Sequence, residues 1–274
     1  MASLRRKIQI ETSTILSSPS VLDLIKSSPS STRGTTRTSR RTTRLAARAA
    51  RQEAHAQQCL HRICSPVTAF KVLDPDPGAV DGGHVLGLRF EVMSRGQFLR
   101  PYYVMLNRPF FPGSEALRMH RHTFPPAVPL SGLAARYLPA PARGEGEGEG
   151  GKRQDLDRFV RTVRREIVRY HNRLGSSADL RRSIIISQGE DETQLDEDDI
   201  VDVGIADIEA KQIKLSWADD RSGRLVMDDN GKVVRLMVFN AGGGRDWDTT
   251  TKLTKDGGEH IEDIVNTLLA YSKG

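Results

Sequence analysis

Histidine and cysteine, both common zinc ligands, gather at two places in this chain. The denser group contains His55, Cys59, His61 and Cys64. In a helix, residues four apart lie on one face, so His55 and Cys59 would be neighbours. However, no second ligand pair follows at the spacing of a zinc finger. We therefore do not predict a metal site in this segment.

The second group lies in the stretch HRHTFPPAVPL, residues 120 to 130. Alternate residues of a β-strand point to the same side, so His120 and His122 would share a face while Leu117 and Met119 point to the core. Two histidines are half of a metal site, and the sequence offers no evident third ligand. We predict that both are solvent-facing strand residues.

Patterns for covalent or phosphate chemistry are also missing from the sequence. Neither cysteine lies in a nucleophile motif, and there is no Gly-x-Ser-x-Gly elbow. Gly242 to Gly244 lack the Gly-Lys-Ser/Thr of a phosphate-binding loop, so a hairpin or connecting loop is expected there. The acidic stretch at 188 to 199 is a run of like charges without fixed geometry for acid-base chemistry. The sequence predicts no enzyme, no catalytic residue and no cofactor.

Positive charge is concentrated at the N-terminus of the 274 residues. Residues 1 to 50 contain ten lysines and arginines against Glu11 and Asp23, which gives +8. Because the whole chain carries +6, the remaining residues sum to −2. The basic segment would attract DNA through a sequence-independent, salt-sensitive interaction, but it has no aromatic residue on which a base could stack.

The N-terminal composition also bears on targeting. A segment rich in arginine and serine and poor in acids is typical of a mitochondrial transit peptide, so import stays open as an alternative. The sequence has no signal-peptide apolar region and no run of eighteen apolar residues, so no membrane span is predicted. Two cysteines are too few for a disulfide framework and fit a reducing compartment.

The first 64 residues are expected to lie outside the folded domains. Residues 1 to 43 contain too few apolar side chains to offset the ordering entropy, so we predict a disordered tail. Ser18 and Ser28 each precede a proline and would be accessible to a proline-directed kinase, although Ser-Pro is common in any such tail. Residues 44 to 64 are rich in good helix formers, but their apolar heptad positions form a weak seam.

A first α+β unit is predicted over residues 65 to 176. Its clearest strand puts Leu86, Leu88, Phe90 and Val92 on one face. Residues 139 to 152 have no packing side chains and are expected to be a flexible surface insertion. A long amphipathic helix follows, with Asp155 as its N-cap and Gly175 as its end. A row of arginines lies on the far side of that helix, and we expect a solvated face: Arg158, Arg161, Arg165 and Arg169.

An acidic linker at 177 to 199 is predicted to lead into a second unit at 200 to 274. One strand puts Ile213, Leu215 and Trp217 on one face, and the Asn-Gly pair at 230 and 231 predicts a hairpin.

The last long strand of this unit is apolar on both faces. Val234, Leu236 and Val238 point one way, and Met237 and Phe239 point the other. One face would pack on a C-terminal helix at 259 to 272, and the other needs another domain or another chain. The apolar stripe of that helix contains Ile261, Ile264, Val265, Leu268 and Leu269. The fold class is therefore α+β, with two antiparallel sheets each packed by helices.

Four stretches of the chain resemble a known family. They are VTAFKVLDPDP, HVLGLRFEVMSRGQFLRPYYVMLNRP, HRHTFPPAVPLSGLAARYLP and DLDRFVRTVRREIVRYHNRLGSSADLRR. In this order, within residues 61 to 182, they are similar to the centromere protein O (CENP-O) family of inner-kinetochore subunits, in particular its members from filamentous fungi. Residues 200 to 272 are similar mainly in their layout of strands and a last helix.

The resemblance implies tandem RWD domains and a non-catalytic scaffold in a COMA-type complex of the kinetochore, in the nucleus. It implies pairing with a CENP-P-like subunit, and docking of CENP-Q-like and CENP-U-like subunits. RWD domains are related to ubiquitin-conjugating enzymes, but no cysteine follows the proline loop in the first unit or occurs in the second. Pro125, Pro126 and Pro129 would fix that loop as architecture.

For the heterodimer contact we expect the last long strand and its neighbours: Val234, Leu236, Val238, Ile213, Leu215 and Trp217. The alternative is a DNA- or chromatin-binding protein that acts through its basic N-terminal tail.

Overall fold

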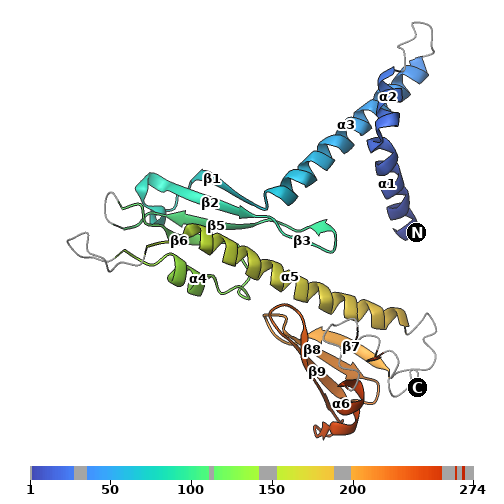
Figure 1. The fold of residues 1–274 in the computed structure, drawn as a ribbon, viewed down its shortest axis with the longest axis vertical. Helices are drawn as coiled ribbons and strands as arrows, with labels where there is room; N and C mark the ends of the chain where they lie inside the picture. Colours follow the sequence, from blue (N-terminus) through green and yellow to red (C-terminus); the bar gives the residue numbers. More distant parts are fainter. Residues whose placement is uncertain are drawn as a thin grey trace. The chain divides into compact units, whose positions relative to one another are not determined.

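The computed structural model describes residues 2–27, 36–110, 114–141, 153–187, 199–254, 263 and 267–268. The chain divides into two compact units, Met1–Pro66 and Val67–Gly274. The first unit is helical, and the second contains two antiparallel sheets packed by helices (Figure 1). This arrangement confirms the predicted α+β class.

Three helices form the N-terminal unit: α1 (Ala2–Ser17), α2 (Pro19–Ser27) and α3 (Thr36–Cys64). Residues 2–27 and 36–43, where the sequence predicts a disordered tail, are helical, and the helix predicted at 44 to 64 begins eight residues earlier. Serine and threonine hydroxyls in α1 donate hydrogen bonds to backbone carbonyls of the preceding turn. For example, the Thr12 hydroxyl donates to the Ile8 carbonyl at 2.7 Å. Helices α1 and α2 both contact α3, so tertiary contact adds to local propensity.

The first sheet has the order β1-β2-β5-β6 and is antiparallel throughout. Its strands are β1 (Val67–Leu73), β2 (His84–Phe90), β5 (Tyr102–Asn107) and β6 (Arg118–His122). Two short 3-10 helices, η1 (Pro77–Ala79) and η2 (Asp81–Gly83), connect β1 to β2. The hairpin of β3 (Met93–Ser94) and β4 (Gln97–Phe98) precedes β5.

One face of this sheet packs against α4 (Leu130–Tyr137) and α5 (Leu156–Ser187). The predicted apolar face of β2 is confirmed as part of this core, which also contains Phe159, Val163 and Ile167 of α5. Asp155 is the N-cap of α5, because its Oδ1 accepts a hydrogen bond of 2.8 Å from the Arg158 amide.

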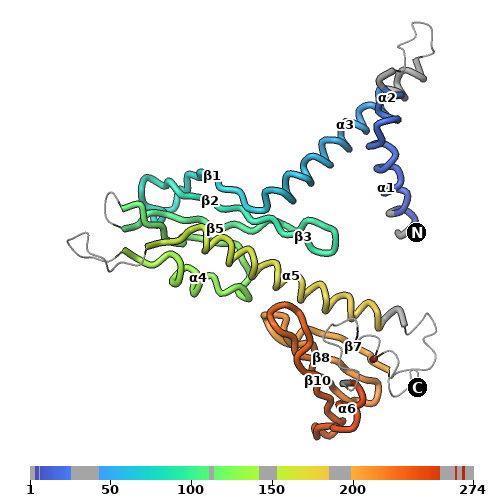
Figure 2. The backbone as a smooth tube through the Cα atoms, viewed as in Figure 1, coloured from blue at the N-terminus to red at the C-terminus, as the bar shows by residue number. Residues whose placement is uncertain are grey.

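Helix α5 does not end at Gly175, as the sequence analysis predicts, but continues to Ser187 (Figure 2). A glycine inside a helix costs about 1 kcal/mol relative to alanine. That cost is offset because Leu180 and Ile184, beyond the glycine, are buried in the second core. The first eleven residues of the predicted linker therefore belong to the helix, and residues 188–198 lie outside the described residues.

The second sheet is also antiparallel and has the order β11-β10-β9-β8-β7. Its strands are β7 (Ile200–Ile205), β8 (Gln212–Trp217), β9 (Ser222–Met227), β10 (Val233–Phe239) and β11 (Arg245–Asp246). The predicted Asn-Gly hairpin joins β9 to β10, and Gly231 adopts a positive φ of 85° there. The triple glycine at 242 to 244 lies in the turn between β10 and β11, where Asn240 donates to the Gly244 carbonyl at 2.8 Å.

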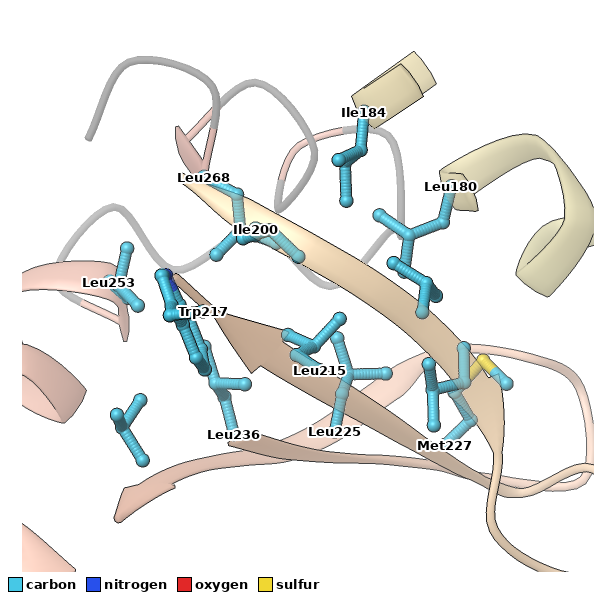
Figure 3. Packing of buried hydrophobic residues seen from close by; sticks show 13 residues of the cluster. Leu180, Ile184, Ile200, Leu215, Trp217, Leu225, Met227, Leu236, Leu253 and Leu268 are labelled. Atoms are coloured by element: carbon cyan, nitrogen blue, oxygen red, sulfur yellow. The ribbon is translucent and has the colours of Figure 1, made fainter. Parts of the chain in front are cut away.

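The second core lies between this sheet, the C-terminal part of α5 and α6 (Trp247–Thr254), as Figure 3 shows. Of the C-terminal helix predicted at 259 to 272, only Asp263, Thr267 and Leu268 are described, and all three are helical. Leu268 is buried in this core. The other four residues of the predicted stripe, Ile261, Ile264, Val265 and Leu269, lie outside the described residues.

Candidate functional site

The strand expected to contact a partner lies mostly inside the chain's own second core. Five of the six predicted contact residues are between 0% and 3% exposed: Leu236, Val238, Ile213, Leu215 and Trp217. Leu180 and Ile184 of α5, Leu253 of α6 and Leu268 complete the cluster around them. The expectation that these five side chains touch a partner directly does not fit this burial.

Val234 is the exception among the six, at 67% exposed. The register of β10 against β9 shifts between Val233 and Arg235, so Val234 sits in a β-bulge. The extra residue breaks the period-two alternation on which the prediction depended. On the opposite face of β10, Met237 and Phe239 are only partly buried. If β10 is covered by another domain or chain, this is therefore the face that it would cover.

A more apolar candidate for a partner contact is the face of the first sheet that α4 and α5 do not cover. We call it the outer face. Its apolar side chains are Phe70 and Val72 of β1, Val85 of β2, and Tyr103 and Met105 of β5. Helices α4 and α5 pack on the other side, and all of these side chains except Val85 remain partly exposed. This surface was not predicted from the sequence, although alternate residues of YYVMLN are apolar on both faces.

A glycine shapes the centre of the outer face. Gly87 stands directly opposite Phe70, and a Cβ atom at Gly87 would lie 2.5 Å from the phenyl ring. The ring therefore lies over the glycine, and it meets Tyr103 edge-on with 6.2 Å between the ring centroids. Beside these residues is a hollow of about 350 Å³ with a mixed lining: Val72, Leu73, Pro75, Tyr103 and Met105 are joined by the polar Asp74, Arg121, His122 and Thr123.

One end of the outer face is held by a cluster of charged side chains. Nε2 of His120 lies 3.3 Å from Oδ2 of the buried Asp74, and Arg121 pairs with Asp76. A hydrogen bond from the Gly78 amide, and then the Arg121 charge, lower the pKa of Asp76 below its ordinary value. These contacts attach the β1–β2 connection to β6.

The prediction for the two histidines is wrong for His120, whose side chain is only 11% exposed. A register shift in β6, where Met119 pairs with Leu106 but Arg121 with Met105, leaves His120 in a bulge. The two histidines therefore do not alternate as the period-two rule requires. His122 is exposed, as predicted.

The three prolines at 125, 126 and 129 lie in the connection between β6 and α4. The Val128 amide donates to the Pro125 carbonyl at 3.1 Å, and the Leu133 amide to the Pro129 carbonyl at 3.0 Å. Just before the prolines, Phe124 is buried and packs edge-on against Phe90, with ring centroids 5.2 Å apart. The loop thus places an aromatic side chain in the first core.

A half-buried histidine lies beside this aromatic cluster. The Tyr102 hydroxyl and Nε2 of His171 are 2.8 Å apart, and the Tyr102 ring packs on Phe124. Burial lowers the pKa of His171 below 6.5 and raises the pKa of Tyr102. The neutral form of His171 is therefore the one that the folded chain favours.

We expect the free energy of unfolding to fall as the pH is lowered from 7.5 to 5.5. His171 in the unfolded chain titrates near 6.5 and in the folded chain at a lower pH, so between the two values the unfolded state binds more protons. This contribution is complete above pH 6.5 and is lost on acidification. Urea unfolding at both pH values measures it. A His171→Gln variant should show a smaller pH difference, and an equal difference in both proteins would contradict the assignment.

The cysteines and serines considered in the sequence analysis do not form a site within the described part of the chain. Cys59 is half-buried and Cys64 exposed on α3, and no group of three or more metal-ligating side chains occurs among the described residues. None of the described helices is long and apolar enough to cross a membrane. Ser18 lies between α1 and α2, and Ser28 is outside the described residues, so both phosphorylation sites stay predictions.

The comparison with protein families decides the identity. The model of a family described as Cenp-O kinetochore centromere component matches residues 67–268. The chain belongs to the CENP-O family. As a CENP-O family member, it is a non-catalytic component of the kinetochore and localises to the centromere. The match includes both sheets, and so extends the resemblance into the second sheet. The comparison with curated proteins gives no match.

Proposed function

We propose that this chain is a structural subunit of the inner kinetochore that forms a heterodimer with a CENP-P-like subunit through tandem RWD domains. The pair then docks CENP-Q-like and CENP-U-like subunits in a COMA-type complex for centromere assembly and chromosome segregation. Membership of the CENP-O family supports a role in a kinetochore complex. The surface that supports pairing best is the outer face of the first sheet.

The composition of the outer face is that of an interface core. Its centre consists of aromatic rings and Met105, residue types that are enriched at the centres of protein interfaces. The two arginines on the same face, Arg89 and Arg121, are each paired with a carboxylate. The corresponding face of the second sheet differs, because Lys214, Arg224 and Arg235 are exposed among its apolar residues. A partner that presents an apolar sheet or helix fits the first sheet better.

The energetics favour coverage of this surface. Fully burying one large apolar side chain contributes about 1.5–3 kcal/mol, and Phe70, Val72, Tyr103 and Met105 are all partly exposed in the single chain. Leu73, at the end of β1, is 67% exposed. Together with the hollow beside Met105, these residues offer a pocket that an anchor side chain of the partner would fill.

We expect Met105→Asp to weaken heterodimer formation by about a hundredfold, which corresponds to the loss of one central contact of about 2–3 kcal/mol. The carboxylate would have to leave water when the partner covers it. In the chain alone it remains in contact with water, so the chain should still fold. Titration calorimetry with the separately purified CENP-P-like subunit measures the affinity. Thermal unfolding of the variant alone checks that it still folds.

Val234→Asp is the matched control, because the same charge is placed on an exposed residue of the second sheet. It should leave the affinity unchanged. If Val234→Asp abolishes pairing and Met105→Asp does not, the partner binds the second sheet, as the sequence analysis expects. If light scattering shows that the unmodified chain and the CENP-P-like subunit stay separate, the heterodimer proposal itself is wrong.

A further inference from the structure

Helix α3 carries a row of arginines along one face. Arg44, Arg48 and Arg51 follow one another at spacings of four and three residues, which places them on the same side of an α-helix. All three are exposed. We call these three residues the arginine row. In the sequence, Arg37 and Arg41 continue the same spacing toward the start of the helix.

The charges of the arginine row are not neutralised within the described part of the chain. None of the ion pairs found there includes any of the three, and the only acid in the sequence of α3 is Glu53. Like charges three and four residues apart destabilise a helix. The row therefore has an electrostatic cost that a polyanion would relieve.

The arginines of α5 show the contrast. Arg161 pairs with Asp157, and Glu166 lies within ion-pair distance of both Arg165 and Arg169. Carboxylates of the same helix thus pair with three of the four arginines predicted to form a solvated face. Among the described helices, α3 is the one that combines an exposed arginine row with a single acid, Glu53.

The chemistry of the row favours phosphate over an acidic protein surface. Guanidinium groups bind phosphate oxygens in a bidentate manner, and residues 1 to 66 carry twelve lysines and arginines against three acids. Protein interfaces have an apolar centre, which the arginine row does not supply. From Arg44 to Arg51 the helix advances about 10 Å, a length over which one strand of a DNA duplex presents about three phosphates.

We propose that the arginine row binds the phosphate backbone of double-stranded DNA without reading its sequence. Residues 1 to 66 contain no Phe, Trp or Tyr on which bases could stack, so the contact is to the backbone. The chain is a centromere component, so DNA is present where it acts. This inference goes beyond the proposed heterodimer and uses a different part of the chain.

The test measures the affinity of the full-length chain for a labelled 30-base-pair duplex of arbitrary sequence, by fluorescence anisotropy between about 50 and 200 mM salt. The variant replaces the row by glutamine (Arg44→Gln, Arg48→Gln, Arg51→Gln), a residue with a similar helix propensity. The matched control removes the same charge from exposed arginines of α5 (Arg158→Gln, Arg164→Gln, Arg182→Gln). Circular dichroism checks that the helix content is unchanged.

The row variant should bind the duplex at least about tenfold more weakly at the lowest salt, and its salt slope should be smaller by about three, one for each lost phosphate contact. The control should retain both values. The proposal is overturned if the unmodified chain does not bind DNA at low salt, or if the row variant matches the control. It is also overturned if the row variant retains its affinity for DNA but no longer binds a kinetochore subunit that co-purifies with the unmodified chain. Pairing with the CENP-P-like subunit, measured separately, is expected to be unchanged.

Discussion

We expect Leu236→Asp to unfold the second sheet of the isolated chain, with no partner present. Leu236 is 2% exposed and lies in a core with Leu225, Trp217 and Leu253 (Figure 3). The substitution removes a large apolar contact and places a carboxylate within a cluster of buried apolar side chains. Burying an unpaired charge is among the few changes that cost more than about 4–5 kcal/mol, a large part of the stability of a typical domain.

The readout is denaturant unfolding followed by the fluorescence of Trp217, which lies in the same core. Val234→Asp is again the control, two residues away on the same strand, and should change the free energy of unfolding by less than about 0.5 kcal/mol. If Leu236→Asp leaves the stability of the isolated chain unchanged but prevents partner binding, then Leu236 belongs to an interface and its assignment to the core is wrong.

The second large effect is expected at Arg173, a charged residue of α5 that is 4% exposed. Its Nε donates to the Glu209 carbonyl at 2.9 Å and its Nη1 to the Asp229 carbonyl at 2.8 Å. These carbonyls belong to the β7–β8 and β9–β10 connections, so one guanidinium ties two turns of the second sheet to the helix. A hydrogen bond from a charged donor contributes about 1.5–3 kcal/mol, and Arg173→Ala should therefore lower the free energy of unfolding by about 3 kcal/mol or more.

Hydrogen exchange at residues 206 to 211 and 228 to 232 would show where this stability is lost, because both turns should exchange faster in the variant. Arg169→Ala, one turn earlier in α5, is the comparison. Arg169 pairs with Glu166 at a partly exposed position, and a pair of this kind contributes less than about 1 kcal/mol. Equal losses of stability in the two variants would refute the role assigned to Arg173.

Local patterns predicted much of the fold because they describe contacts between residues close in sequence. The apolar face of β2, the cap at Asp155 and the hairpin at Asn230 all follow from such patterns. The two bulges did not, since a register shift depends on how a strand pairs with its neighbour. One extra residue in β10 turned Val234 to the solvent, while Leu236 stayed in the core.

The continuation of α5 past Gly175 and the helices at residues 2–27 and 36–43, neither of which the sequence predicts, share a cause. Glycine and Ser/Thr-rich stretches are weak helix formers on their own, but distant side chains can override that preference. Leu180 and Ile184 gain a core only because the second sheet lies beside them, and α1 and α2 contact both each other and α3. The outer face was missed for a different reason. Its significance depends on which side the helices cover, and a single sequence does not specify that.

The continuity of α5 has a mechanical consequence. The same helix contributes Phe159, Val163 and Ile167 to one core and Leu180 and Ile184 to the other, and Ile167 and Leu180 are about 20 Å apart along its axis. The helix is therefore a rigid element shared by both sheets. A pulling force applied to one sheet is transmitted to the other along the helix axis, because each end of the helix is packed into a core and no flexible linker lies between them.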